Sequence, residues 1–199
     1  MENIILVGFG GHGKSVADCI QRLRRFRIIG YTDLEQHNSQ YQYLGTDDVL
    51  PEYFCKGVRN AAIGIGFMGR DNTRSRLYEE LKRIGYSLPA IVDPSAIISE
   101  TAQIGEGAFI GKGAVLNADA RVGRMAIVNT KALIEHECIV GDYSHIAVAA
   151  VLCGQAQIGN SAFVGANATV IQDMHVPSGT FIPAGDVVRK GYRYNQNGH

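Results

Sequence analysis

The stretch ALIEHECIVGDYSHIAV, residues 132–148, decides the fold of this chain. Its aliphatic residues Ile134, Val140 and Ile146 recur every six positions, and the same spacing runs from Val92 to Val188, seventeen times without an insertion. A small residue, mostly alanine, stands four positions after most of them. A period of six fits neither a helix of 3.6 residues per turn nor a strand that alternates every two residues. It predicts a hexapeptide repeat, whose physical solution is a parallel β-helix.

Each six-residue unit predicts one short strand and one turn, and three units close a triangular coil of about 18 residues. The aliphatic residue should point inward, and the small residue lets the chain turn near the packed interior. Residues 18 positions apart should therefore stack one coil above another, about 4.8 Å away. Seventeen units give a little over five coils.

A different pattern precedes the repeat. The aliphatic run at residues 3–7 predicts a buried strand, and it leads into the loop GFGGHGK, residues 8–14, with G-x-G-x-x-G spacing. Residues 15–25 have helical spacing, and a second strand over residues 27–31 ends at Thr32-Asp33. Asp33 stands 20 residues after Gly13, where a Rossmann-type fold places the acid that holds a ribose.

A third strand over residues 60–65 and a helix over residues 71–84 complete this part of the chain. We therefore expect two domains, a Rossmann-like βαβ domain over residues 1–86 and a β-helix domain over residues 87–199. The tail after Lys190 is polar, and we expect it to be mobile.

The glycine loop predicts a phosphate site, because glycines let backbone N–H groups approach a pyrophosphate at the start of a helix. A nicotinamide cofactor is the first alternative, but about 86 residues make only half of a dinucleotide fold, and no second half follows. A nucleotide sugar, which carries one nucleoside diphosphate, suits the site better. A tight turn without any ligand is the other alternative.

Composition narrows the function classes. The 199 residues carry a formal net charge of zero, so binding to nucleic acid has no electrostatic support. No apolar run approaches the length of a membrane span, and the start of the chain does not resemble a signal peptide. The four cysteines lack paired or metal-type spacing. We expect a cytoplasmic protein with reduced thiols, without a nucleic-acid or membrane partner.

Polar exceptions to the repeat are candidates for chemistry, because a regular coil needs no histidine. His136 lies two residues after the inward Ile134 and should project from a corner. Glu137 follows it and could hydrogen-bond one imidazole nitrogen, which would make His136 a good general base. Gly154, 18 residues on, should lie one coil away, where its backbone N–H could polarise a carbonyl. His145 is half a coil from His136.

Two other interpretations of these residues are open. His136 with an acidic neighbour could be an ordinary surface histidine. Metal binding by His136, Glu137 and His145 is disfavoured because their spacing matches no ligand pattern, and no metal is expected. His12, inside the glycine loop, is a candidate substrate contact, whereas His37, His175 and His199 have the pattern of surface residues.

The glycine loop, the repeat and three segments of it together resemble the sialic acid O-acetyltransferase-like sugar acyltransferases. The segments are Asn129-Thr130, Ile134-Glu135-His136-Glu137-Cys138 and Ser144-His145. Within that family the chain looks most similar to nucleotide-sugar N-acetyltransferases that act on 4-amino-4,6-dideoxy sugars, in surface polysaccharide or glycan biosynthesis. The resemblance covers nearly the whole chain up to Lys190.

The resemblance implies a left-handed β-helix and a homotrimer with acetyl-CoA as co-substrate between neighbouring subunits. By resemblance, the catalytic base falls on His136, and the acid that supports it falls on Glu137. The cofactor contacts fall on His145, Gly154, Ala166 and Ala184. The nucleotide-sugar contacts fall on Gly10, Gly11, His12, Thr32, Asp33 and Gly64. The chain departs from the family at its C-terminus, where residues 181–185 lack the usual motif that helps to hold CoA.

The expected function is acetyl transfer from acetyl-CoA to the 4-amino group of a nucleotide-linked sugar, with direct attack of the amine. The first alternative is O-acetylation of a sugar hydroxyl by the same groups. The second is a β-helix protein that binds a nucleotide sugar without catalysis. The sequence fixes neither the nucleotide base nor the sugar.

Overall fold

The computed structural model describes residues 1–68 and 72–194. These residues form two compact units. The first is built from residues 1–66 and 72–91, and the second from residues 67–68 and 92–194. Within these ranges, no helix is long and apolar enough to cross a lipid bilayer.

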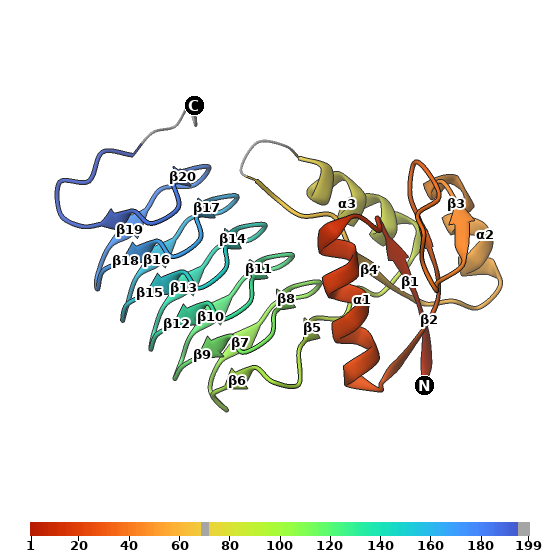
Figure 1. Cartoon of the computed structure of the whole chain (residues 1–199), viewed down its shortest axis with the longest axis horizontal. Helices are drawn as coiled ribbons and strands as arrows, with labels where there is room; N and C mark the ends of the chain where they lie inside the picture. Colours follow the sequence, from red (N-terminus) through yellow and green to blue (C-terminus); the bar gives the residue numbers. More distant parts are fainter. Residues whose placement is uncertain (69–71, 195–199) are drawn as a thin grey trace. The chain divides into compact units, whose positions relative to one another are not determined.

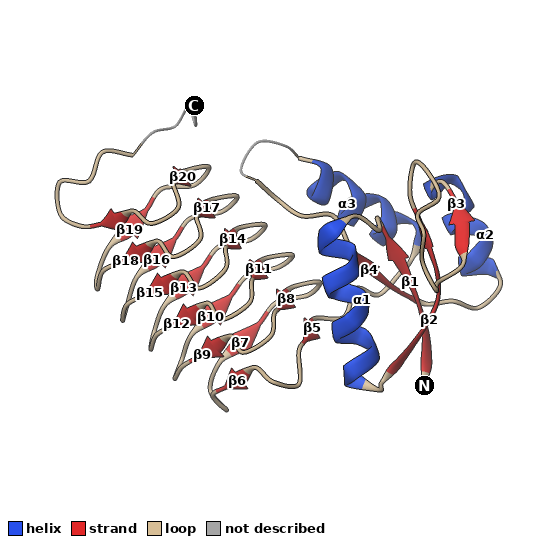
Figure 2. Cartoon of the chain, in the orientation of Figure 1, coloured by secondary structure: helices blue, strands red, loops and turns tan. Residues whose placement is uncertain are grey.

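The first unit contains a parallel sheet with the strand order β3-β2-β1-β4 (Figures 1 and 2). Its strands are β1 (Glu2–Val7), β2 (Phe26–Thr32), β3 (Tyr43–Gly45) and β4 (Asn60–Ile63). Its helices are α1 (Gly11–Leu23), the 3-10 helix η1 (Asp47–Val49), α2 (Leu50–Cys55) and α3 (Thr73–Ile84). Residues 4–7 of the inner strand β1 are at most 1% exposed, because a parallel strand covered on both faces is apolar along its length.

The three predicted strands and two predicted helices of this unit are present with small shifts at their ends. Helix α1 begins at Gly11, inside the glycine loop and four residues before the predicted start at Ser15. Strand β3 was not predicted, because three residues are too few to show a period. The predicted start of the last helix, Asp71, lies outside the described residues.

Three parallel sheets of two-residue strands form the second unit. The first contains β7 (Gln103–Ile104), β10 (Arg121–Val122), β13 (Ile139–Val140), β16 (Gln157–Ile158) and β19 (His175–Val176). The second contains β5 (Ile91–Val92), β8 (Phe109–Ile110), β11 (Ile127–Val128), β14 (His145–Ile146), β17 (Phe163–Val164) and β20 (Phe181–Ile182). The third contains β6 (Ile97–Ile98), β9 (Val115–Leu116), β12 (Leu133–Ile134), β15 (Val151–Leu152), β18 (Thr169–Val170) and β21 (Val187–Val188).

Paired residues in neighbouring strands are 18 positions apart, as in Leu133 with Val151 and Ile134 with Leu152. The chain therefore visits the three sheets in turn, as the stack of coils in Figure 1 shows. This confirms the predicted fold class, a Rossmann-like βαβ region followed by a left-handed parallel β-helix of a little over five coils.

The first residue of each strand faces outward, and it gives each sheet its own character. We call the sheet from β7 to β19 the polar sheet, because its outward residues include Gln103, Arg121, Gln157 and His175. The sheet from β5 to β20 is the aromatic sheet, with Phe109, His145, Phe163 and Phe181. The sheet from β6 to β21 is the aliphatic sheet, with Ile97, Val115, Leu133, Val151 and Val187, and with Thr169 as its polar member.

The interior of the coil is filled by the inward aliphatic residues and by the small residues four positions later. Alanine dominates the second set, but Ser144 and Thr180 in this set are buried and carry hydroxyl groups. Ser144 is fully buried, and its hydroxyl donates to the carbonyl of Gly159 at 2.7 Å and accepts from the N–H of Ala162 at 3.1 Å. The burial of Ser144 is tolerated because its hydroxyl both donates and accepts a hydrogen bond.

Left-handed backbone conformations mark the turns of the β-helix. Ten non-glycine turn residues between Asp119 and Asp173 have φ between 54° and 64°. Each stands three positions after an inward residue, so the repeat imposes the same turn whatever side chain is present. Side chains at this position therefore stack in columns along the corners of the coil.

The end of the coil is covered by the segment after Lys190. The Tyr192 hydroxyl donates to Asp186 at 2.7 Å, the Tyr194 hydroxyl donates to the carbonyl of His175 at 2.9 Å, and both rings pack against the interior. The expectation of a mobile polar tail is therefore wrong for residues 191–194, because the two tyrosines cover apolar surface that the last coil would otherwise expose. The later residues of the tail lie outside the described part of the chain.

Candidate active site

The turn after β12 carries the histidine singled out by the sequence. His136 Nδ1 lies 3.2 Å from Glu137 Oε2, and the two side chains are 55% and 54% exposed. An ionised carboxylate only accepts hydrogen bonds, so Nδ1 carries a proton, and in the neutral imidazole the lone pair is on Nε2. Glu137 has φ 58°, and this left-handed conformation turns its side chain back alongside the imidazole.

Neighbouring coils hold this turn from both sides. The N–H of Glu137 donates to the carbonyl of Ala118 in the preceding coil, and the carbonyl of His136 accepts from the N–H of Gln155 in the following coil, both at 2.9 Å. The N–H of His136 donates to Glu135 Oε2 at 3.1 Å. The backbone that carries the imidazole is therefore fixed on each side of the histidine.

Gly154 lies directly against the ring, one coil after His136 as expected. A Cβ atom added to Gly154 would come 2.5 Å from His136 Nε2 and 2.6 Å from Cε1, far inside van der Waals contact. The missing side chain therefore leaves room for the imidazole. Its Nε2 edge faces the backbone that the sequence analysis proposed as a hydrogen-bond donor.

His145 lies on another face of the β-helix, in strand β14 of the aromatic sheet, and it is 7% exposed. Its Nδ1 is 2.6 Å from the carbonyl of Phe67, its Nε2 is 3.2 Å from Asn129 Nδ2, and its ring meets Phe163 edge to face. Because a carbonyl only accepts hydrogen bonds, Nδ1 carries a proton that it donates to Phe67. Within this chain the structure does not bring His145 to His136.

Ala166 and Ala184 occupy the turns after β17 and β20, which join the aromatic sheet to the aliphatic sheet. They stack as predicted, and the N–H of Gly185 donates to the carbonyl of Ala166 at 2.9 Å. His136 and Gly154 lie in turns that join the aliphatic sheet to the polar sheet. The alanine track, Ala166 and Ala184, and the histidine turn thus border the aliphatic sheet on opposite edges.

The glycine loop of the first unit combines tight packing with an open end. Gly13 and Gly64 are buried, and a Cβ on either would meet the carbonyl oxygen of Gly8 at 2.5 Å or less. Gly10 and Gly11 face open space, where an added Cβ would meet nothing within 4 Å. The first turn of α1 contains no acidic residue and its N-cap has no side-chain cap, as suits an anion at a helix N-terminus.

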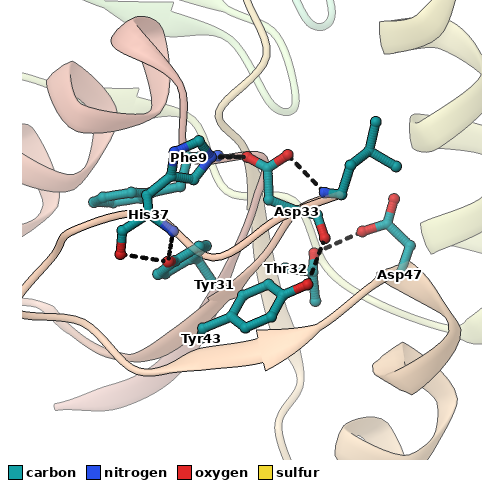
Figure 3. A network of polar contacts seen from close by, with 8 residues as sticks. Phe9, Tyr31, Thr32, Asp33, His37, Tyr43 and Asp47 are labelled. Carbon is teal, nitrogen blue, oxygen red and sulfur yellow. Dashed lines mark hydrogen bonds and ion pairs between the residues drawn. The ribbon is translucent and has the colours of Figure 1, made fainter.

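Asp33 closes this loop onto β2, as Figure 3 shows. Its Oδ2 accepts from the N–H of Phe9 at 2.7 Å and lies 3.0 Å from His37 Nε2, while its Oδ1 accepts from the N–H of Leu34 at 2.7 Å. Partial burial raises the pKa of Asp33, but these hydrogen bonds outweigh burial and hold the pKa below its ordinary value. Asp33 therefore stays ionised and organises the mouth of the glycine loop.

His37 is not an ordinary surface residue, which corrects the sequence-based expectation. Its ring bonds to Asp33, and its N–H donates to the hydroxyl of Tyr31 at 2.7 Å (Figure 3). The neighbouring Thr32 is fully buried and its hydroxyl donates to Asp47 Oδ1 at 2.6 Å. His12 lies in the first turn of α1, partly exposed, His175 is exposed on β19, and His199 lies outside the described residues.

Comparison with known proteins gives one family match over the first part of the chain and several similar solved structures. Residues 3–81 match the family described as the PglD N-terminal domain. The chain is similar to perosamine N-acetyltransferase from Caulobacter crescentus, solved as two variants of one histidine in complex with CoA and GDP-perosamine. The two chains are 28% identical with a TM-score of 0.89, over 95% of this chain and 89% of that chain.

The chain is also similar to the acetyltransferase domain of PglB from Neisseria gonorrhoeae, with 29% identity and a TM-score of 0.85, over 95% of this chain and 92% of that chain. Both of these similar structures are acetyltransferases, and each matches this chain over 95% of its length. A search of curated proteins gave no match. The resemblance inferred from the glycine loop and the His136 repeat unit is confirmed.

Two cysteines, Cys138 and Cys153, lie near the histidine turn. The Cys138 thiol is buried and donates to the carbonyl of Cys153 at 3.1 Å. Burial raises the pKa of Cys138 to about 11, so the thiol is protonated at neutral pH and is a poor nucleophile. Among the described residues, no group of three or more His, Cys, Asp and Glu side chains could hold a metal ion.

Two side-chain amides at this turn were not predicted from the sequence. Gln155 Nε2 donates to Glu137 Oε2 at 3.2 Å, and Asn117 Nδ2 donates to Glu135 Oε1 at 2.8 Å. Each amide stands 18 positions from the glutamate it contacts, so the coil period would have identified both. The pair Asp33 and His37 had no such signal, because the loop that carries His37 follows no repeat.

Proposed function

We propose that this chain transfers an acetyl group from acetyl-CoA to the 4-amino group of a nucleotide-linked amino-deoxy sugar. The observation that carries the proposal is the His136 imidazole, with Nδ1 bonded to Glu137 and Nε2 facing Gly154. The complexes of the Caulobacter enzyme with CoA and GDP-perosamine support the two substrate classes. The open glycine loop with its ionised Asp33 supports a nucleoside diphosphate in the first unit.

The chemistry follows from the tautomer of His136. The neutral amine attacks the thioester carbonyl carbon, and Nε2 of His136 takes the proton that the amine nitrogen loses. Glu137 then faces an imidazolium and stabilises its charge. The backbone N–H of Gly154 is the proposed donor to the oxyanion. Collapse of the tetrahedral intermediate breaks the C–S bond, and the CoA thiolate takes the proton from His136.

A covalent acyl-enzyme has no suitable nucleophile at this turn. The buried Cys138 thiol is held protonated, and its hydrogen bonds point to backbone carbonyls. Direct transfer between two bound substrates is therefore the proposed route.

We further propose that the chain acts as a homotrimer with its active sites between subunits. The aliphatic sheet supports association, because Ile97 is 67% exposed and Val187 50% exposed, and both lie in one column with Val115, Leu133 and Val151. The histidine turn and the alanine track border this sheet on opposite edges. Packing the sheet edges of two subunits together would let the turn of one face the track of the other.

The experiment is a thiol-release assay with acetyl-CoA and a panel of UDP-, GDP- and dTDP-linked 4-amino sugars, each paired with the matching 4-hydroxy sugar. We expect turnover with an amino sugar and little with its hydroxy partner. His136→Ala should lower kcat by roughly 10²- to 10⁴-fold with KM little changed. Full activity of His136→Ala would rule out the assigned base, and preference for hydroxy sugars would replace N-acetylation with O-acetylation.

A further inference from the structure

The corner that carries the histidine turn presents a column of polar side chains. Asp119, Glu137, Gln155 and Asp173 are each 18 positions apart, and all four have left-handed φ between 58° and 64°. Three of them are acids, and Gln155 is the neutral member. It separates Glu137 from Asp173 in the column.

Gln155 contacts the oxygen that matters for the proposed base. Its Nε2 donates to Glu137 Oε2 at 3.2 Å, and this is the same oxygen that lies 3.2 Å from His136 Nδ1. A carboxylate oxygen can accept both bonds at once. The His136 and Glu137 side chains are both half exposed, so the imidazole alone does not fix the orientation of Glu137. The Gln155 amide gives the carboxylate a second hydrogen bond.

A second amide holds the other glutamate of the turn. Asn117 Nδ2, one coil earlier, donates to Glu135 Oε1 at 2.8 Å, and Glu135 Oε2 accepts from the N–H of His136 at 3.1 Å. His136 therefore stands between two carboxylates, and each carboxylate is held by an amide from an adjacent coil. One amide comes from the coil before the histidine and the other from the coil after it.

We propose that Asn117 and Gln155, which we call the amide clamp, are positioning residues for the general base. Gln155 holds Glu137 against Nδ1, and Asn117 holds Glu135 against the main chain of His136, so that Nε2 is directed over Gly154. This inference rests on the proposed function. Neither amide touches the reacting atoms.

Gln155 has to be uncharged as well as long enough to contact Glu137. The carboxylates of this corner are Glu135 and Glu137 in the histidine turn and Asp119 and Asp173 in the column, and the thiols of Cys138 and Cys153 lie beside them. A further carboxylate at residue 155 would remove the donor to Glu137 and add a negative charge beside the pair. That charge would favour the imidazolium, which cannot accept a proton from the amine.

The test compares four single variants in the full chain. Gln155→Leu removes the donor and should lower kcat about 5- to 20-fold while KM for both substrates stays within about twofold, because only the orientation of the base changes. Gln155→Glu should also move the acid limb of the pH–rate profile up by about 0.5 to 1 pH unit. Asn117→Leu should lower kcat several-fold. Gln103→Glu makes the same amide-to-carboxylate change on the exposed β7 and should behave as wild type.

A readout without turnover separates this inference from the proposed function. The NMR titration midpoint of the ¹⁵N-labelled His136 ring should rise in Gln155→Glu and stay unchanged in Gln103→Glu. If wild type is active and His136→Ala inactive, but the Gln155 variants keep the wild-type kcat and pH profile, the amide clamp is refuted alone. If wild type releases no CoA with any sugar while the NMR midpoint shifts as expected, the proposed function is refuted and the local geometry stands.

Discussion

The His136 imidazole lies over the α-carbon of Gly154, so closely that a single methyl group at residue 154 would meet Nε2 at 2.5 Å. The two residues are 18 positions apart, one full coil, and the stacking of coils brings them together. The space beside the proposed base is therefore set by the absence of a side chain one coil away. This relationship gives a test that leaves every polar group in place.

Gly154→Ala should lower kcat by about 10- to 100-fold, because the new methyl group displaces the ring from its bond to Glu137. Stability should change little, since Ala118 occupies the same turn position two coils earlier and shows that the backbone accepts alanine there. The measurement is steady-state kinetics with a thermal unfolding curve. Ala118→Gly serves as the control and should keep wild-type activity. An active Gly154→Ala enzyme would show that the ring does not need this position.

Complementation between subunits tests the placement of the active site. His136→Ala removes the base, and Ala184→Arg blocks the alanine track, so each variant alone should be inactive. If each site uses the base of one subunit and the track of its neighbour, a cyclic trimer that contains both variants has one working site in three. Co-expression of two differently tagged chains and assay of the purified mixed trimer measures this fraction. No activity in the mixed trimer would place both elements in the same subunit.

Asp33→Asn should destabilise the first unit by about 1 kcal/mol at neutral pH, because the variant loses charge-assisted hydrogen bonds from Phe9, Leu34 and His37. The pKa of Asp33 is lowered in the folded chain, so its contribution to stability is complete above the ordinary aspartate pKa of 3.8 and is lost as pH falls through the lower pKa of the folded chain. The difference from wild type should therefore shrink in acid.

Urea unfolding at pH 7 and pH 3 measures that difference. Glu35→Gln, a carboxylate-to-amide change in the same loop, is the matched control and should be neutral at both pH values. A difference for Asp33→Asn that is equal at the two pH values would show that the carboxylate charge contributes nothing.

Alkylation should distinguish the cysteines. Burial raises the pKa of Cys138 to about 11, so at pH 8 its thiolate is about 100-fold rarer than that of an ordinary thiol with a pKa near 9. Iodoacetamide should therefore label the exposed Cys55 first and Cys138 very slowly, as followed by peptide mass spectrometry. Labelling in urea should remove the difference. Equal rates in the folded chain would contradict the burial of Cys138.

The β-helix was predictable from sequence because its period is global. Each inward residue repeats the same physical requirement, and a register of 18 places His136 beside Gly154 without any further information. The same register of 18 relates Gln155 to Glu137 and Asn117 to Glu135, although neither contact was predicted. The role of His37 could not be predicted, because it depends on how an irregular loop packs against Tyr31 and Asp33. The tail was predicted to be mobile because most of its residues are polar. That prediction took no account of Tyr192 and Tyr194, whose rings pack against the apolar interior of the last coil.

The uninterrupted repeat has a consequence for how such a chain can change its length. Inserting one residue between His136 and Gly154 would rotate every later side chain out of alignment and separate the ring from its glycine. Adding or deleting a whole set of eighteen elsewhere would leave the pair untouched. In evolution, the β-helix can therefore gain or lose whole coils, whereas the segment from His136 to Gly154 has to keep its length of one coil.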